Sequence, residues 1–124
     1  MSTFAQDLSV LRQKADGMAF EDLFSAFADL CREHGEELSP LNATYRVKAT
    51  DTGRCFTLRL EGGKVSVPGE QAPADVTLLA TESNGVALIA GRLSPALALL
   101  TRKLKVQGSM AALTAFAPYL EGKK

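Results

Sequence analysis

The sequence predicts an α+β fold in which helices lie over one face of a sheet. Apolar residues recur every three or four positions near both ends of the chain, which is typical of amphipathic helices. Between residues 43 and 67 they recur at every second position, which is typical of strands with one buried face. Helices at both ends of a group of strands indicate α+β rather than alternating α/β architecture. At 124 residues, the chain suits one domain with a modest core.

Two helices are predicted at the N-terminus. The first is capped by Ser2 or Thr3, ends near Gly17 and has a narrow apolar seam. The seam consists of Phe4, Leu8, Leu11, Ala15 and Met18. It is too short for a self-sufficient coiled coil, so we expect it to pack on the domain or on a second copy of itself. The second helix has a wider, phenylalanine-rich face that consists of Phe20, Leu23, Phe24, Phe27, Leu30 and Cys31.

Turn residues divide the middle of the chain into strands. Asp51-Thr52-Gly53 and Glu61-Gly62-Gly63 separate three segments that read as an antiparallel meander. These segments are 44–49, 55–60 and 64–67. A fourth strand is predicted at 75–80 and a fifth at 104–107.

Capping residues predict three further helices. Thr81 begins one that ends at Gly91, and the pair Ser94-Pro95 begins a short one. Ser109 begins the last helix, whose final turn we expect Pro118 to kink or loosen.

Residues 96–100, Ala-Leu-Ala-Leu-Leu, leave the short helix with almost no polar face. A helix that is apolar all round is usually buried on several sides, and we expect that here. In so small a domain, these extra apolar side chains either fill the core or line a space for an apolar guest molecule.

The composition argues against several classes of protein. Fourteen basic and fourteen acidic residues give zero net charge, which argues against nucleic-acid binding. No apolar run approaches the ~20 residues that span a bilayer, and the N-terminus does not resemble a signal peptide. Cys31 and Cys55 lack CxxC spacing and are expected to be reduced. We therefore expect a cytoplasmic protein without a transmembrane segment.

No catalytic or metal-binding motif is recognisable. GxSxG, HExxH and P-loop patterns do not occur, and no base is placed beside a serine nucleophile. His34, the only histidine, lies near a predicted helix end, where partnership with the helix dipole is favoured over metal binding. We expect no enzymatic activity, no metal and no cofactor.

The chain from about Phe20 to Leu120 resembles the sterol carrier protein 2 family of lipid-binding domains. The phenylalanine-rich helix, the meander and the strand Ala74-Asp75-Val76-Thr77-Leu78 match it. More specific is the succession Gly91-Arg92-Leu93-Ser94-Pro95, then Ala98, then Lys103-Leu104-Lys105-Val106-Gln107-Gly108. The family commonly has a Gly, a basic residue, Leu, a small residue and Pro there, followed by a Lys-Leu-Lys strand that ends in Gly.

The resemblance implies a five-stranded, mostly antiparallel sheet with an apolar tunnel between it and the helices. Its function would be non-catalytic binding or carriage of a fatty acyl, sterol-like or isoprenoid lipid. Because Pro118 weakens the final turn of the last helix, we expect this helix to open as a gate. The chain would then divide into a helical extension at 1–19 and a lipid-binding domain at 20–124. The candidate lining residues are Phe24, Phe27, Leu78, Ile89, Leu93, Leu97, Leu100, Leu104, Val106, Met110, Leu113, Phe116 and Leu120.

Two departures from the family pattern leave a further hypothesis open. Leu99-Leu100 stand where the family usually has Phe-Met, and Arg102 stands where many members have Gly. A plugged tunnel would follow if these side chains pointed inward. The C-terminus also lacks the peroxisomal Ser-Lys-Leu-type address of eukaryotic members.

The partners remain open between two classes. The lipid carrier competes with an accessory or assembly subunit of a lipid or quinone metabolic complex, acting through the N-terminal helix. That helix could also form a homodimer. Basic residues lie near the short helix, and we interpret them as a solvated surface because exposed charges are the default. The alternative is a rim that attracts anionic lipid headgroups, and such a rim would allow transient membrane contact. The basic residues are Arg92, Arg102, Lys103 and Lys105.

Overall fold

The computed structural model of the chain describes residues 2–69 and 71–121. The helices within these ranges are α1 (Phe4–Lys14), α2 (Phe20–Glu33), α3 (Glu82–Ala90), α4 (Pro95–Leu100) and α5 (Met110–Leu120). The strands are β1 (Ala43–Ala49), β2 (Cys55–Glu61), β3 (Lys64–Ser66), β4 (Val76–Ala80) and β5 (Lys105–Gly108). The predicted α+β fold is therefore confirmed. None of the described helices is both long and apolar enough to cross a bilayer.

Side-chain caps begin three of the helices as the sequence predicts. The Thr3 hydroxyl accepts a hydrogen bond from the Gln6 amide at 3.2 Å, and the Gln6 side chain accepts one from the Thr3 amide. Thr81 and Ser109 cap α3 and α5 through the amides three residues further on. Ser94 precedes α4 but makes no such bond. The last helix continues through Pro118 to its end at Leu120.

The sheet has the strand order β3-β2-β1-β4-β5 and is mixed, which corrects the expected mostly antiparallel sheet. The meander is antiparallel, but β4 pairs parallel to β1, with Tyr45 opposite Val76 and Val47 opposite Leu78. After β3, the chain crosses back so that β4 starts at the same end of the sheet as β1. The guanidinium of Arg46 donates a hydrogen bond to the Ala72 carbonyl and so ties this connection to the sheet.

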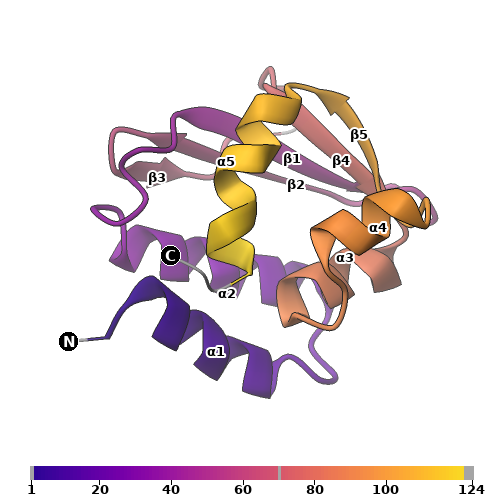
Figure 1. The fold of residues 1–124 in the computed structure, drawn as a ribbon, viewed down its shortest axis with the longest axis horizontal. Coiled ribbons are helices and arrows are strands. Elements are labelled where there is room, and N and C mark those ends of the chain that lie inside the picture. Colours follow the sequence, from indigo (N-terminus) through magenta and orange to yellow (C-terminus); the bar gives the residue numbers. More distant parts are fainter. Residues whose placement is uncertain (1, 70, 122–124) are drawn as a thin grey trace.

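The helices cover one face of the sheet in two layers (Figure 1). α2 and α3 pack against the strands, and α1 packs against both of these helices. Phe4, Leu8 and Ala15 are buried in the common core, so the apolar seam of α1 is occupied within the chain. α5 crosses the sheet beside the other helices (Figure 1).

The short helix α4 is not buried on several sides, which corrects the expectation for residues 96–100. Pro95 and Ala98 face the core, but Leu97 is 58% exposed and Leu100 is 80% exposed. The helix has only six residues, and no described element covers its outer side. Its apolar surplus therefore forms surface rather than core.

Candidate lipid-binding cavity

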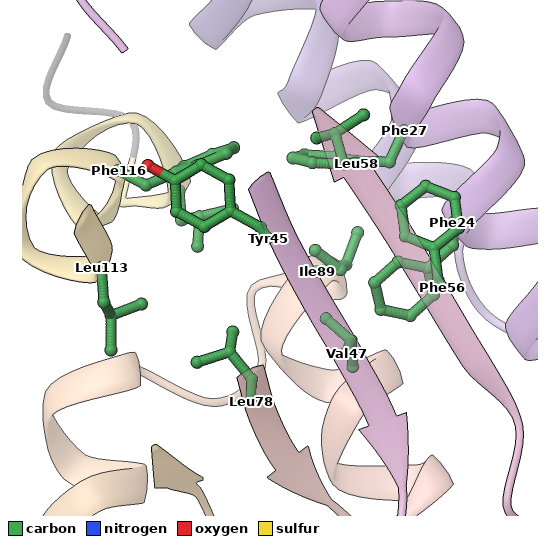
Figure 2. Close-up of a pocket in the computed structure, with 11 residues that line it drawn as sticks. Phe24, Phe27, Tyr45, Val47, Phe56, Leu58, Leu78, Ile89, Leu113 and Phe116 are labelled. Carbon is green, nitrogen blue, oxygen red and sulfur yellow. The ribbon is translucent and has the colours of Figure 1, made fainter. Parts of the chain in front are cut away.

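An apolar cavity of about 50 Å³ lies between the sheet and the helices α2, α3 and α5. Figure 2 shows side chains from β1, β2 and β4 converging on those of the three helices. A second cavity of about 30 Å³ shares part of this lining and extends toward Pro95 at the start of α4. The larger cavity is lined by Phe24, Phe27, Tyr45, Val47, Phe56, Leu58, Leu78, Ile89, Leu113, Phe116 and Leu120.

The cavity offers a ligand no free polar group. Tyr45 carries the one polar side chain of its lining, and its hydroxyl donates to the Ala112 carbonyl of α5 at 2.9 Å. Burial, with a smaller contribution from the charge of Asp75, raises the pKa of Tyr45 to about 12. The hydroxyl therefore stays protonated and engaged, so the walls can select a guest only by its apolar surface.

The structure does not show the apolar tunnel that the family resemblance implies. The two cavities are far smaller than the roughly 150 Å³ that accommodates benzene in a protein interior. Aromatic rings occupy the space instead. Phe24 lies 5.0 Å from Phe56 and Tyr45 lies 4.8 Å from Phe116, measured between ring centroids. A lipid can enter this space only if side chains or helices move apart.

The structure places the thirteen sequence candidates in three groups. Leu93 and Val106 are partly buried against the core without lining either cavity. Leu97, Leu100 and Met110 point away and are more than half exposed, Met110 at 51%. The remaining candidates line one or both cavities, namely Phe24, Phe27, Leu78, Ile89, Leu104, Leu113, Phe116 and Leu120.

Four strand residues of the lining are not among the sequence candidates, whereas Leu78 of β4 is. Tyr45 and Val47 of β1 and Phe56 and Leu58 of β2 form the cavity floor. Their alternation along the chain already places them on one face of the predicted strands. That face was therefore recognisable as a cavity wall from the sequence.

Hydrogen bonds hold both ends of α5 over the cavity. Near its start, Tyr45 binds the Ala112 carbonyl. Near its end, the Tyr119 hydroxyl donates to the Glu37 carbonyl at 3.0 Å. Arg12 of α1 donates to the carbonyls of Ile89 at 2.9 Å and of Leu120, which lie in the last turns of α3 and α5. A cation at two helix C-termini is also favoured by the helix dipoles.

A model of the SCP-2 sterol transfer family matches residues 24–121, which is most of the chain. The chain belongs to the SCP-2 sterol transfer family. The match leaves α1 and the first turn of α2 outside.

Comparisons with known proteins place the SCP-2 fold in several settings. The chain is 27% identical over 109 residues to human hydroxysteroid dehydrogenase-like protein 2, covering 87% of this chain but only 26% of that protein. The sterol carrier protein domain 2 of Helicoverpa armigera is 24% identical, covers 80% of this chain and 88% of its own, and superposes with a TM-score of 0.56. The ubiquinone synthesis protein UbiJ-SCP2 is 20% identical, with 76% and 77% coverage and a TM-score of 0.55. The two structures share the fold.

The two departures from the SCP-2 pattern do not plug the cavity. Leu100 and Arg102 are exposed, and Leu99 lines neither cavity. Arg102 has a φ of 62°, the left-handed conformation that glycine adopts without strain. Glycine would therefore fit this position without backbone strain. The narrowness of the cavity comes from its aromatic rings.

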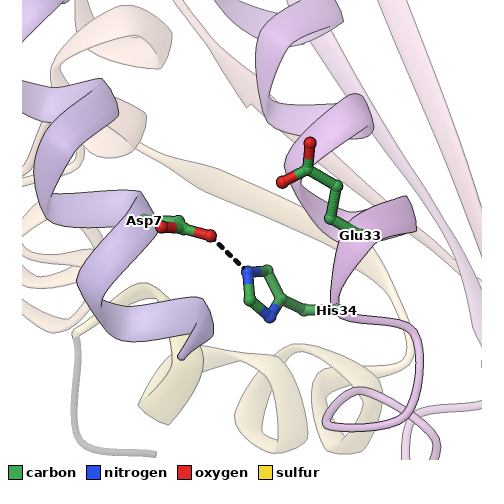
Figure 3. Close-up of side chains that lie close together, drawn as sticks. All are labelled: Asp7, Glu33 and His34. Atoms are coloured by element: carbon green, nitrogen blue, oxygen red, sulfur yellow. Dashed lines mark hydrogen bonds and ion pairs between the residues drawn. The ribbon is translucent and has the colours of Figure 1, made fainter. Parts of the chain in front are cut away.

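His34 joins α1 to the end of α2 through two carboxylates. Its Nε2 lies 2.6 Å from an oxygen of Asp7 (Figure 3), and its Nδ1 lies 2.7 Å from an oxygen of Glu37. Burial lowers the pKa of His34, but the hydrogen bond to Asp7 and the charge of Glu37 outweigh it and raise this pKa above its usual value. The hydrogen bond from His34 in turn lowers the pKa of Asp7. The two acids therefore favour the imidazolium form of the ring.

Asp7 and His34 also form, with Glu33, a group of possible metal ligands, but this group is a poor metal site. Ligand atoms of Asp7, Glu33 and His34 lie within 4.8 Å of one another (Figure 3). A metal needs the lone pair of a neutral imidazole nitrogen. Both nitrogens of His34 face carboxylates at hydrogen-bonding distance, and the imidazolium form that these acids favour has no lone pair to offer. The arrangement is an ion-pair clasp for α1, and the position at the α2 terminus also suits the predicted dipole partnership.

We expect His34 to make stability depend on pH near neutrality. The pKa of His34 is higher in the folded chain than in the unfolded chain, where it is about 6.5. The stability that His34 contributes is therefore complete below the unfolded pKa and is lost as pH rises through the folded pKa. His34→Gln should lower the free energy of unfolding by about 1 kcal/mol at pH 6, since both acids keep some access to water. Urea denaturation across a pH series should show this difference shrink as pH rises. A difference that is constant or grows toward alkaline pH would contradict the assignment.

Proposed function

We propose that the chain binds or carries an apolar lipid without catalysing its conversion. One observation carries this proposal, namely a cavity in an SCP-2 fold whose whole lining offers apolar surface and no free polar group. Apart from the engaged Tyr45 hydroxyl, the lining holds no acid, base or nucleophile that could act on a guest. Fatty acyl, sterol-like and isoprenoid groups all fit this chemistry.

Apolar burial gives such a ligand free energy of the same size as the cost of association. Each methylene taken out of water contributes about 0.8 kcal/mol, so fourteen contribute roughly 11 kcal/mol. Association costs roughly 4 to 15 kcal/mol. A long chain can therefore bind without a polar anchor inside, and a charged headgroup stays at the cavity mouth.

Entry requires that the cavity expand, and α5 is the element whose movement would open it. Leu113, Phe116 and Leu120 form the α5 side of the cavity. The end of the helix is held by hydrogen bonds from Tyr119 and Arg12, and Pro118 removes a backbone donor in the same turn. Displacement of this end would let a chain pass between α5 and the sheet, and ligand release would reverse it.

Leu113→Trp tests this proposal by filling the cavity. Leu113 lines both cavities, so a larger ring there should occupy the space of the ligand while the spare volume limits overpacking. We expect saturable binding of a fluorescent fatty acid by the unmodified chain and at least about tenfold weaker binding by the variant, a loss of about 1.4 kcal/mol. Native mass spectrometry should detect co-purified lipid only in the unmodified chain.

Val10→Trp is the matched control. Val10 is exposed on α1, away from the cavity, so the same enlargement there should leave binding unchanged. No saturable binding by the unmodified chain would reject lipid carriage. Equal binding by all three proteins would reject the cavity as its site.

The second candidate is an accessory subunit that holds a lipid beside partner enzymes in lipid or quinone metabolism. Its support is the α1 extension outside the family match and the fold shared with UbiJ-SCP2. Because the seam of α1 is buried, a partner would contact the outer side of this helix, where Val10 is exposed. Light scattering distinguishes a monomeric carrier from a chain that assembles.

A further inference from the structure

The charges of the chain are distributed unevenly along the sequence. Between Glu82 and Glu121 there is no acidic residue, but there are four basic ones. The rest of the chain has ten basic and fourteen acidic residues, so zero net charge conceals a positive C-terminal part and a negative remainder. Arg92 pairs with Asp16 at 3.0 Å. The other three cations pair with no carboxylate in the described ranges, and they are Arg102, Lys103 and Lys105.

The outer sides of α4 and α5 carry no charge at all. Leu97 and Leu100 on α4 and Met110 at the start of α5 are three of the five large apolar side chains exposed among the described residues. Neither helix contains a charged residue, whereas α2 has charged residues on its exposed side. A helix that is apolar on its solvent side normally faces another apolar phase.

Two of these cations border the apolar surface at α4. The turn after α4 folds back on the helix, with the amides of Lys103 and Leu104 donating to the Ala98 carbonyl at 2.8 and 3.1 Å. Arg102 and Lys103 therefore lie at the end of α4 beside Leu100. Lys105 pairs with Leu79 and alternates with the core-facing Val106, so its side chain lies on the opposite face of the sheet. Figure 1 shows α4 next to the start of β5.

We propose that the α4–α5 surface, with Leu97, Leu100, Met110 and the two flanking cations Arg102 and Lys103, docks on an anionic lipid bilayer. Exposed leucines enter the boundary between headgroups and acyl chains, and neighbouring cations hold the phosphates. The inner sides of the same helices line the cavities through Pro95, Leu113 and Leu120. The inference rests on the proposed function, because docking here would let a lipid pass between bilayer and cavity without crossing water.

Charge favours a bilayer over a second copy of the chain as the occupant. A symmetric dimer through this surface would bring the same cations face to face, and like charges across an interface are unfavourable. An anionic bilayer is both apolar and complementary in charge. Because the remainder of the chain is acidic, the same field would also orient the chain with this surface toward the membrane.

Vesicle co-sedimentation tests the docking surface. The unmodified chain should bind vesicles of phosphatidylcholine with phosphatidylglycerol, and bind phosphatidylcholine alone far more weakly. Leu97→Ser with Leu100→Ser should weaken binding to the anionic vesicles at least about tenfold. Arg102→Gln with Lys103→Gln should weaken it about 25-fold, a factor of about five for each cation.

Two control pairs change the same chemistry elsewhere. Val10→Ser with Val67→Ser removes exposed apolar groups, and Lys14→Gln with Lys64→Gln removes two exposed cations. We expect little loss of vesicle binding from either pair. The proposal is overturned if the unmodified chain does not sediment with anionic vesicles or if the controls lose as much. It is also overturned if sedimentation velocity shows a dimer that Leu97→Ser with Leu100→Ser dissociates.

A fatty-acid titration without vesicles separates this proposal from the proposed function. If the docking variants still bind the fatty acid but no longer bind vesicles, the surface is supported as a membrane contact. Titration without any vesicle binding rejects the docking surface alone. Vesicle binding without titration rejects lipid carriage, and with it the passage from bilayer to cavity.

Discussion

Phe116→Ala is expected to lower the free energy of unfolding by about 3–5 kcal/mol. Phe116 is buried in the middle of α5, with its ring edge-on to Tyr45 at 4.8 Å between centroids and 6.1 Å from the ring of Phe27. The substitution removes the main apolar contact between α5 and the layer beneath it and leaves a larger void. Chemical denaturation at neutral pH measures the loss.

Ligand addition makes the Phe116→Ala result informative about function. The enlarged cavity should accept a fatty acid, so a saturating ligand should restore part of the lost stability by binding only the folded chain. Leu8→Ala in the core between α1 and α2 is the control, since Leu8 is equally buried but lines neither cavity. Stabilisation of both variants to the same extent would contradict a ligand site under α5.

The fold follows closely from residue periodicity, but one pairing in the sheet does not. Alternation fixes which side of β1 and β2 is buried, and caps such as Thr81 and Ser109 fix where helices begin. The parallel pairing of β4 with β1 depends on where the 67–75 connection crosses the sheet. Arg46 and Ala72 hold that connection across 26 residues, a contact that no local pattern contains.

The candidate site could be predicted for positions whose burial is set by their own helix or strand. Leu113, Phe116 and Leu120 line the cavity because they share one side of α5. Leu97 and Leu100 differ, because the same apolar character leads to exposure where no neighbouring element covers the helix. Whether such a surface is core or contact is decided by tertiary packing, which the sequence around α4 does not encode.

The ion pairs of His34 with Asp7 and Glu37 could not be predicted from the sequence either. Asp7 lies 27 positions away from the histidine, and Glu37 lies in the loop that follows α2. Only the packing of α1 on α2 brings the two carboxylates to opposite nitrogens of one ring. An isolated histidine near a helix end therefore predicted the dipole contact but not the ion pair that fastens the extension.

Gly108→Ala is expected to lower the free energy of unfolding by about 3 kcal/mol or more, since backbone strain and overpacking each cost about 1–3 kcal/mol. Gly108 joins β5 to α5 with a φ of 98°, which side chains other than glycine rarely adopt. A Cβ atom there would lie only 2.4 Å from the Asp75 carbonyl oxygen. The same oxygen accepts the Ser109 amide at 2.8 Å, so the backbone that starts α5 would have to shift.

Gly53→Ala separates the two causes, because Gly53 has a similar φ of 77° but nothing within 4 Å of an added Cβ. Gly53→Ala should lower the free energy of unfolding by about 1 kcal/mol, from backbone strain alone. Denaturation of both variants then isolates the contact with Asp75 as their difference. A shifted α5 start would also displace Leu113, so Gly108→Ala alone should weaken fatty-acid binding. Equal losses of stability in the two variants would mean that the backbone at Gly108 accommodates the added Cβ without a further loss of stability. The position of α5 would then be determined by its side-chain contacts rather than by its connection to β5.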